Sequence, residues 1–214
     1  MISVDLKLSP ADLRLLGNPP MNGAITLKGK HMIRTLKFSS TVAALMLGSV
    51  AFAANPDVGG APMFADKNIV ENAVNSADHT TLVAAVKAAG LVDALMSDGP
   101  FTVFAPVNDA FAALPDGTVE TLLKPENKDT LTKVLTAHVV AGNLSGRELM
   151  SKARNSADGF FHLDTLSGDA LSAQVKSGVL YIYDESGNAG RVTIADVNQS
   201  NGVIHVVDTV LLPK

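Results

Sequence analysis

Histidine, serine and acidic side chains are the groups of this sequence that could do chemistry, because the chain contains no cysteine. A zinc site would therefore need His, Asp and Glu ligands alone. The histidines do not offer such a set, since none belongs to an H-x-x-x-H or H-E-x-x-H pair and no acidic cluster lies at ligand spacing. The five are His31, His79, His138, His162 and His205. We expect neither a metal site nor a cofactor.

Motifs for nucleophilic catalysis and nucleotide binding are also missing. The segment 142–146 (GNLSG) has its serine one position too late for the G-x-S-x-G nucleophile elbow. The sequence contains no G-x-G-x-x-G fingerprint and no P-loop lysine. The acidic segment 184–188 (DESGN) offers too few oxygen ligands for calcium, so a hairpin turn is expected there. Nothing in these patterns requires an enzyme.

Asn108 and Asp109 form a polar pair at a predicted strand-to-helix corner, an arrangement that could serve a catalytic site. The strand is predicted over 101–105 from its β-branched and aromatic residues, and Pro106 ends it because proline cannot donate to a sheet ladder. A short helix that carries Phe111 follows. We expect Asn108 to cap this helix and Asp109 to stabilise its positive N-terminus, so neither residue needs a catalytic role.

The first part of the chain is predicted to be helical from its capping signals and its apolar spacing. Segments 68–71 (NIVE) and 145–148 (SGRE) both have the form of a capping box. Apolar residues recur at i, i+3 and i+4 between Leu131 and His138, which indicates one face of a helix. The predicted helices are 69–77, 80–89 with Gly90 as its stop, a turn at 91–96, a short helix at 119–123, one that starts near Asn127, and a short one through Leu149 and Met150.

From residue 160 onward the apolar residues alternate with a period of two, which predicts strands. Turn residues separate these strands, among them Ser177-Gly178, which suits a two-residue hairpin. Helices first and strands later favour an α+β fold over alternating βαβ units, and the absence of a repeat favours a single domain. The predicted strands are 160–164, 171–176, 179–183, 191–194 and 203–207.

Two of the histidines are expected to be structural. His138 ends the apolar face of its predicted helix, and His205 lies in the middle of a β-branched strand. We expect His138 to be buried near Phe104 or Phe111 and to be neutral and hydrogen-bonded, because burial disfavours the charged imidazole.

Three segments of the chain, in order, resemble the signatures of one family. Thr102–Phe111 (TVFAPVNDAF) resembles the first signature segment of the fasciclin-type (FAS1) domain, an extracellular adhesion and binding module. Ala137–Gly142 (AHVVAG) resembles its Tyr-His segment, with alanine in place of tyrosine. Asn201–Asp208 (NGVIHVVD), followed by LLP, resembles its second signature. The signature residues are Thr102, Phe104, Ala105, Pro106, Asn108, Phe111, His138, Asn201, Gly202 and His205.

This resemblance implies a FAS1 fold over residues 64–214, with N-terminal helices packed on a β-sandwich or wedge formed largely by the C-terminal strands. In some animal members of the family, an Asp-Ile pair just before the second signature takes part in integrin adhesion. The matching positions are Asp196 and Val197, on an expected surface loop, and the resemblance implies that they bind a partner. Because fold does not fix function, the resemblance says less about activity.

Residues Met32–Ala53 are predicted to be a secretory signal peptide. Arg34 and Lys37 supply the positive start, 42–50 the apolar middle, and 51–53 (AFA) the small-x-small cleavage site. The apolar run is shorter than the roughly 20 residues of a transmembrane helix. We expect cleavage after Ala53 and a mature chain that is periplasmic or secreted and has no transmembrane segment.

The remaining N-terminal parts are expected to lie outside the fold. Residues 1–31 are expected to be a misassigned start, with Met32 as the true first residue, or a disordered extension. Residues 54–63 are rich in Pro and Gly and are expected to be a flexible leader. The predicted mature chain, 54–214, carries 11 Lys and Arg against 19 Asp and Glu, a formal net charge of −8. This acidity argues against nucleic acid or an anionic membrane surface as a partner.

The main functional hypothesis is an exported, non-enzymatic FAS1 module that binds a protein or a glycan of a surface or matrix. The alternative is a carrier of an apolar small molecule, a pigment or a lipid, since some FAS1-like proteins resemble pigment-binding proteins. A third hypothesis is an enzyme without a motif that works through a shaped apolar pocket. The groove of a carrier would be lined by Met63, Phe64, Met96, Met150, Phe160 and Phe161.

Overall fold

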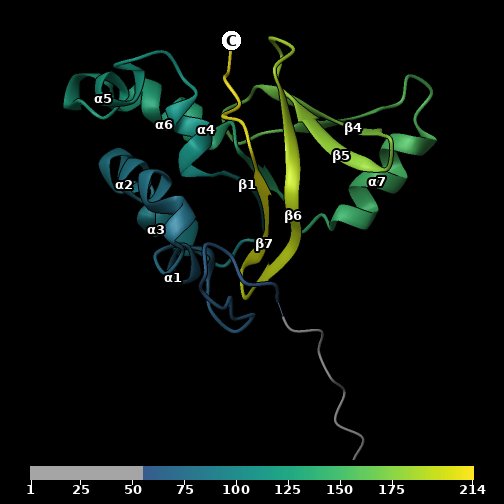
Figure 1. Cartoon of the computed structure of the whole chain (residues 1–214), viewed down its shortest axis with the longest axis horizontal. Helices are drawn as coiled ribbons and strands as arrows, with labels where there is room; N and C mark the ends of the chain where they lie inside the picture. Colours follow the sequence, from purple (N-terminus) through teal and green to yellow (C-terminus); the bar gives the residue numbers. More distant parts are fainter. Residues whose placement is uncertain (1–54) are drawn as a thin grey trace, which may run out of the picture. The chain divides into compact units, whose positions relative to one another are not determined.

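A computed structural model describes residues 55–214 of the chain as a mixed seven-stranded sheet with helices on both sides (Figure 1). The expected signal peptide and residues 1–31 lie outside the described residues. The strand order is β2-β1-β7-β6-β5-β4-β3; β1 and β7 pair in parallel, and all other neighbours are antiparallel. The strands are β1 Phe101–Pro106, β2 Val139–Ala141, β3 Phe160–Asp164, β4 Ala170–Lys176, β5 Val179–Tyr183, β6 Ala189–Gln199 and β7 Gly202–Val207.

The two edges of this sheet meet. An isolated bridge joins Val140 of β2 to Thr165, the residue that follows β3, and the Leu166 amide donates to the Val139 carbonyl at 2.8 Å. The sheet is therefore nearly closed into a barrel. Because a closed sheet leaves fewer unpaired edge groups, this contact protects both outer strands.

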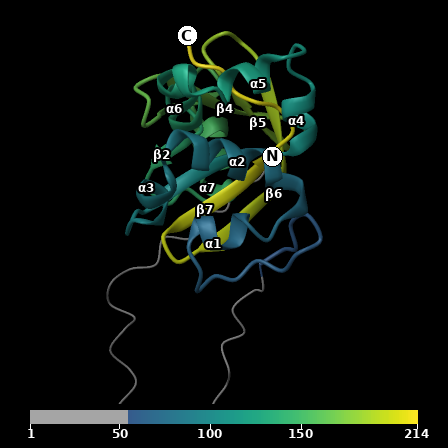
Figure 2. The same ribbon diagram turned by 90° about the vertical axis from the view of Figure 1, so that its left-hand side faces the viewer.

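The helices lie mainly on one side of the sheet. Figure 1 shows α1 to α6 on the side of β1 and β7, and α7 on the other side, beside β4 and β5; Figure 2 looks onto the helical side. None of the helices in 55–214 is both long and apolar enough to cross a membrane. The α-helices are α1 Ile69–Ala73, α2 Thr80–Ala89, α3 Val92–Met96, α4 Asn108–Ala112, α5 Thr118–Leu122, α6 Lys128–Thr136 and α7 Gly146–Asn155, with 3-10 turns at Ala77–His79 and Pro125–Asn127.

Strand β1 divides the core into two halves. Its Phe104 packs with Leu149 of α7 and Ile182 of β5, whereas Val103 and Ala105 pack on the other face with residues of the helical side. This division follows from the strand's geometry, since successive side chains point to opposite faces. All residues of β1 except the first are buried, so the strand is the centre of the fold.

The α+β class and most elements are confirmed. The Asn68 side chain accepts from the Glu71 amide and the Glu71 carboxylate accepts from the Asn68 amide, each at 2.9 Å, so the predicted capping box exists. Gly90 ends α2 with φ of 74°. Ser177 and Gly178 have φ of 50° and 83° and connect β4 to β5, as a primed two-residue turn requires. Strands β3 and β5 have the predicted bounds.

Several elements differ from the prediction. The helix predicted over 69–77 ends at Ala73. Strand β2 was not predicted because three residues show no period, and α7 runs on to Asn155. Strand β6 continues to Gln199 instead of ending near 194. Its pairing with β7 shifts register between Val192 and Ile194 and again between Ile194 and Val197. These bulges break the alternation of apolar residues, so the second half of the strand has no period of two in the sequence.

Asn108 does not cap the helix that it begins, so this prediction is wrong. Its Oδ1 accepts from the Thr81 amide at 3.0 Å and from the Thr80 hydroxyl at 3.2 Å, and its Nδ2 donates to the Ala77 carbonyl at 2.8 Å. Asn108 therefore caps the N-terminus of α2, which lies beside the corner that follows Pro106. The residue type was informative, but its partner is distant in sequence.

The expectation of a flexible leader also differs from the structure at two positions. Val58 and Met63 are buried, 4% and 7% exposed, in the same core half as Val103. Val58 and Ala61 exchange backbone hydrogen bonds, and the Gly59 carbonyl accepts from the Ala77 amide at 3.3 Å. Two apolar side chains in a Pro- and Gly-rich segment are enough to bind it to the core, because their burial is favourable.

Candidate functional site

An apolar cavity of about 280 Å³ lies between the helical side and the sheet. One face of α2 lines it through Leu82, Val83 and Val86, and β1 lines it through Val103 and Ala105. Its other apolar lining residues come from α1, α3, the 55–63 segment, β6 and β7: Val58, Met63, Ile69, Val70, Ala73, Leu91, Val92, Ala94, Leu95, Val197 and Ile204, with Phe101, Phe104, Leu135, Val139 and Leu166 completing the wall. Such a cavity can hold an apolar molecule, because ligand sites are concave and mostly apolar.

The groove predicted for a carrier is not formed. Of its six residues only Met63 lines the cavity. Phe64 and Met96 are each 45% exposed, and Met150 belongs to α7, on the other side of the sheet. The sequence thus indicated the kind of site but not its residues, because the cavity is built mainly from aliphatic side chains that look like ordinary core.

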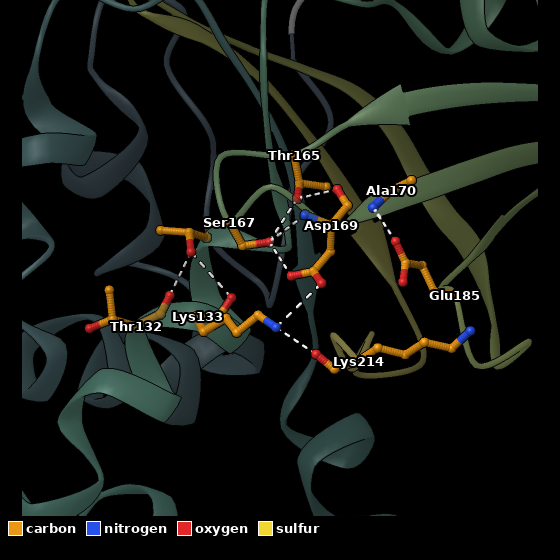
Figure 3. Close-up of polar contacts among 9 residues, drawn as sticks. Thr132, Lys133, Thr165, Ser167, Asp169, Ala170, Glu185 and Lys214 are labelled. Atoms are coloured by element: carbon orange, nitrogen blue, oxygen red, sulfur yellow. Dashed lines mark hydrogen bonds and ion pairs between the residues drawn. The ribbon is translucent and has the colours of Figure 1, made fainter.

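Polar contacts brace the turn between β3 and β4, which carries Leu166 at the edge of the cavity. Figure 3 shows Lys133 of α6 reaching Asp169 and the C-terminal Lys214: Lys133 Nζ lies 3.4 Å from Asp169 Oδ1 and donates to the Lys214 carbonyl at 2.5 Å. The Ser167 hydroxyl donates to Asp169 Oδ2 at 2.7 Å and, with Lys133, lowers the pKa of the Asp169 carboxyl. Serine, lysine and aspartate are therefore bound to one another here, in a structural brace.

His138 connects α6, β1 and the C-terminal segment. Its Nδ1 donates to the Val134 carbonyl at 2.8 Å, and its Nε2 accepts from the Leu211 amide at 2.9 Å. Nδ1 faces a carbonyl and therefore carries a proton, whereas Nε2 accepts from an N–H and therefore carries none, so the ring is neutral. Burial lowers the pKa of His138 to about 4. The predicted buried, neutral and hydrogen-bonded state of His138 is confirmed. His138 also lies next to Phe104 as predicted, since the Phe104 amide donates to the His138 carbonyl at 2.9 Å.

His205 connects β7 with the loop before α7. Its Nε2 donates to the Leu144 carbonyl at 2.8 Å, and its Nδ1 accepts from the Asp196 amide at 3.3 Å. The ring stacks on Phe104 with centroids 5.7 Å apart. Burial lowers the pKa of His205. Both ring nitrogens are thus occupied, and the residue is structural as predicted.

Thr102 and Asn201 also bind the backbone. The Thr102 hydroxyl donates to the Gly142 carbonyl at 2.7 Å and accepts from the Leu144 amide at 2.9 Å. Asn201 accepts from the Ile69 amide at 3.0 Å and donates to the carbonyls of Leu95 and Ser97, each at 2.8 Å, so it holds α1 and α3 against the β6–β7 turn. Both side chains satisfy backbone groups that would otherwise be left unpaired.

Comparison with known proteins identifies the family. Residues 77–213 match the family model described as Fasciclin domain. Protein sll1483 of Synechocystis sp. is 52% identical over 145 residues, which cover 68% of this chain and 73% of that protein. The chain belongs to the fasciclin domain family. Transforming growth factor-beta-induced protein ig-h3 of Sus scrofa is 37% identical over 132 residues, but these cover 62% of this chain and only 17% of that protein.

A solved structure confirms the FAS1 fold. The FAS1 domain pair from the insect cell adhesion molecule Fasciclin I superimposes with a TM-score of 0.61 at 19% identity and covers 68% of this chain and 51% of that chain. The three signature segments named from the sequence therefore mark a FAS1 domain. In the structure the polar residues of these segments lie around β1 and β7 and form hydrogen bonds with the backbone. The signature residues therefore stabilise the fold itself.

Asp196 and Val197, the partner-binding pair implied by the resemblance, are not placed as expected. Val197 is 1% exposed and lines the apolar cavity, so it cannot contact a partner. Asp196 lies within β6 with φ of 60°, and its Oδ1 accepts from the Gly146 amide at 2.7 Å at the start of α7. The pair is in a bulged strand, not on a loop. In this FAS1 domain Asp196 accepts from the first amide of α7, beside the Ser145 cap, and Val197 fills the core.

Replacing Asp196 with alanine should destabilise the FAS1 domain by roughly 1–2 kcal/mol. The change removes the acceptor of the Gly146 amide and leaves a residue less suited to a positive φ. Asp196→Asn keeps an oxygen acceptor and tolerates this backbone conformation, so it should stay within about 0.5 kcal/mol of the parent. Urea denaturation of the three proteins measures the difference, and equal stability of Asp196→Ala and the parent would contradict the stabilising role of this hydrogen bond.

Acidification should destabilise the domain through His138. Its folded pKa of about 4 is below the ordinary 6.5, so below pH 6.5 the unfolded chain binds a proton that the folded chain excludes. The stabilisation is complete above pH 6.5 and is lost as the pH falls toward 4, a change on the order of 3 kcal/mol. Urea midpoints measured across this range should fall, and His138→Gln should flatten the slope. A parent midpoint that is constant over this range would contradict the neutral buried state.

The acidic segment 184–188 is the predicted hairpin turn, between β5 and β6. Asp184 Oδ1 accepts from the amides of Ser186 and Asn188, each at 2.9 Å, and Oδ2 accepts from the Leu212 amide at 3.0 Å. Its carboxylate is thus used by backbone donors. Within 55–214 no group of three His, Asp or Glu side chains could hold a metal ion.

Proposed function

We propose that this FAS1 domain is an exported, non-enzymatic binding module that attaches to a protein or glycan at a cell surface or in a matrix. The observation that carries the proposal is the fasciclin match over 77–213, in a fold shared with domains of an insect cell adhesion molecule. The formal charge of −8 over 54–214 fits a partner other than nucleic acid.

The use of two of the buried histidines, His138 and His205, supports a role without catalysis. Both ring nitrogens of His138 and of His205 are hydrogen-bonded within the domain, and burial lowers the pKa of each. A general base needs a nitrogen within reach of a substrate proton. These rings have no free nitrogen to offer, so they stabilise the fold.

Export is the second part of the proposal. Cleavage after Ala53 would release a mature chain over 54–214, with the FAS1 domain at 64–214, to the periplasm or the medium. Replacing Ala53 with leucine should trap the precursor, because signal peptidase accepts small side chains at this position. N-terminal sequencing of the native protein should find Ala54 first; the intact 214-residue chain in the cytoplasm would contradict export.

The binding function is tested in the cells that make the protein. We expect deletion of the gene to reduce surface attachment or biofilm formation, and the parent gene to restore it. The Ala53→Leu gene is the matched control, since it changes only export and should fail to restore attachment. Normal attachment after deletion, together with turnover of a substrate by the purified protein, would contradict the proposal.

A carrier of an apolar small molecule is the second candidate, and the cavity of about 280 Å³ favours it. Extraction of the native protein with organic solvent, followed by mass spectrometry, should release a bound lipid or polyene in stoichiometric amount. A native preparation that contains no such molecule, and that binds none when one is added, would contradict the carrier function.

A further inference from the structure

We infer that the cavity takes the chain of a medium-length monocarboxylic acid, whose carboxylate pairs with Lys87 at the open end. The inference rests on the carrier function proposed above and names its ligand class. Lys87 is exposed and is the one charged side chain in the cavity wall within the described residues. No Asp or Glu lines the cavity, although the predicted mature chain has 19 of them.

The shape of the cavity favours a slender chain. The residues of one face of α2 and the turn before it line it at successive helical positions: His79, Leu82, Val83, Val86 and Lys87. Eight residues separate His79 from Lys87, which is roughly 12 Å at the helical rise. The volume of about 280 Å³ lies just below the usual range of roughly 300–1,000 Å³ for small-molecule sites. A single alkyl chain suits these dimensions better than a sterol or a long polyene.

Polar side chains of the described cavity lining are bonded to other groups of the domain, so they do not favour a second oxygen function in the ligand. Ser76 Oγ and His79 Nδ1 hydrogen-bond to each other at 2.8 Å, and the Thr136 hydroxyl donates to the Thr132 carbonyl at 2.7 Å. The remaining nitrogen, His79 Nε2, is covered by neighbouring atoms, with the backbone of Ala105 beside the ring. Burial lowers the pKa of His79 and so disfavours the charged ring with which an anion would pair. The inner end of the cavity is therefore suited to a hydrocarbon.

The open end, in contrast, is suited to an anion. Lys87 forms no ion pair with any residue of 55–214. A cation in an otherwise apolar wall complements a carboxylate, and it disfavours a cationic head group by like-charge repulsion.

The test uses three ligands that share one chain and differ in the charge of the head group. Isothermal titration calorimetry on the purified, delipidated full chain should rank laurate above dodecanol, and dodecanol above dodecylamine. Lys87→Met keeps the length of the side chain and removes its charge. It should weaken laurate binding roughly three- to fivefold, as expected for a partly exposed ion pair, and leave dodecanol unchanged. Lys124 is an exposed lysine outside the cavity wall, so Lys124→Met is the matched control. It should change the affinity for neither laurate nor dodecanol.

The remaining outcomes separate this inference from the carrier function. Equal binding of laurate and dodecanol, unaffected by Lys87→Met, would overturn the carboxylate assignment while the carrier function stands. Absence of binding by all three ligands would overturn the inference, and the carrier function would be overturned as well if the native preparation contained no bound lipid or polyene. Val83→Phe should fill the cavity and abolish binding of every ligand; a folded variant, verified by circular dichroism, that still binds laurate would place the ligand elsewhere.

Discussion

Replacing Gly202 with alanine should prevent the domain from folding, with a loss of at least about 4 kcal/mol of stability. Gly202 begins β7 with φ of 155°, opposite Phe101 in the parallel pairing with β1. A Cβ at this position would lie 2.0 Å from the Phe101 carbonyl oxygen and 2.8 Å from its amide nitrogen. These are backbone atoms of the central strand, so they cannot move away without separating β1 from β7.

Soluble expression and urea denaturation followed by circular dichroism measure this effect. Gly187→Ala is the matched control, because Gly187 has φ of 86° but nothing within 4 Å of an added Cβ. It should cost only roughly 1–2 kcal/mol, the strain of a left-handed alanine. A soluble Gly202→Ala protein with the urea midpoint of the parent would show that close contact of β1 and β7 is not required.

Truncating Phe104 to alanine should cost about 3–5 kcal/mol. Its side chain is fully buried at the centre of the sheet and stacks on His205 with centroids 5.7 Å apart. The change would leave a void between the sheet and α7 and would remove the support of the His205 ring. Because His205 holds the Leu144 carbonyl, the loop before α7 should loosen as well.

Urea denaturation measures the loss, and hydrogen exchange of the 142–146 amides should report the loosened loop. Phe64→Ala is the control, since Phe64 is 45% exposed and should lose no more than about 1 kcal/mol. If Phe104→Ala and Phe64→Ala lowered the free energy of unfolding by the same amount, Phe104 would not be the centre of the core.

The fold was predictable from sequence where the signals are local. The capping box at Asn68, the stop at Gly90 and the hairpin at Ser177-Gly178 depend on a few neighbouring residues, and each is present in the structure. Asn108 shows the limit of such signals. Its side chain was expected to cap the helix that follows, yet it caps α2, which begins 28 residues earlier. A residue that suits a cap does not reveal which helix it caps.

The candidate site was less predictable, because it depends on how distant segments meet. Val197 was implied as a binding residue from its position before the second signature, but the bulges of β6 turn it into the core. The cavity is lined by aliphatic residues of α2 and β1 that are indistinguishable from core in the sequence. Lys87 had no sequence signal of its own. What makes it notable is its place in an otherwise uncharged wall.

Saturation binding of the labelled, purified protein to native envelopes tests most directly the proposal that this FAS1 domain binds a partner at a surface or in a matrix. We expect saturable binding that excess unlabelled protein displaces and that the unfolded Gly202→Ala chain does not show. Binding that rises linearly without saturation, or that the unfolded chain reproduces, would contradict the proposal.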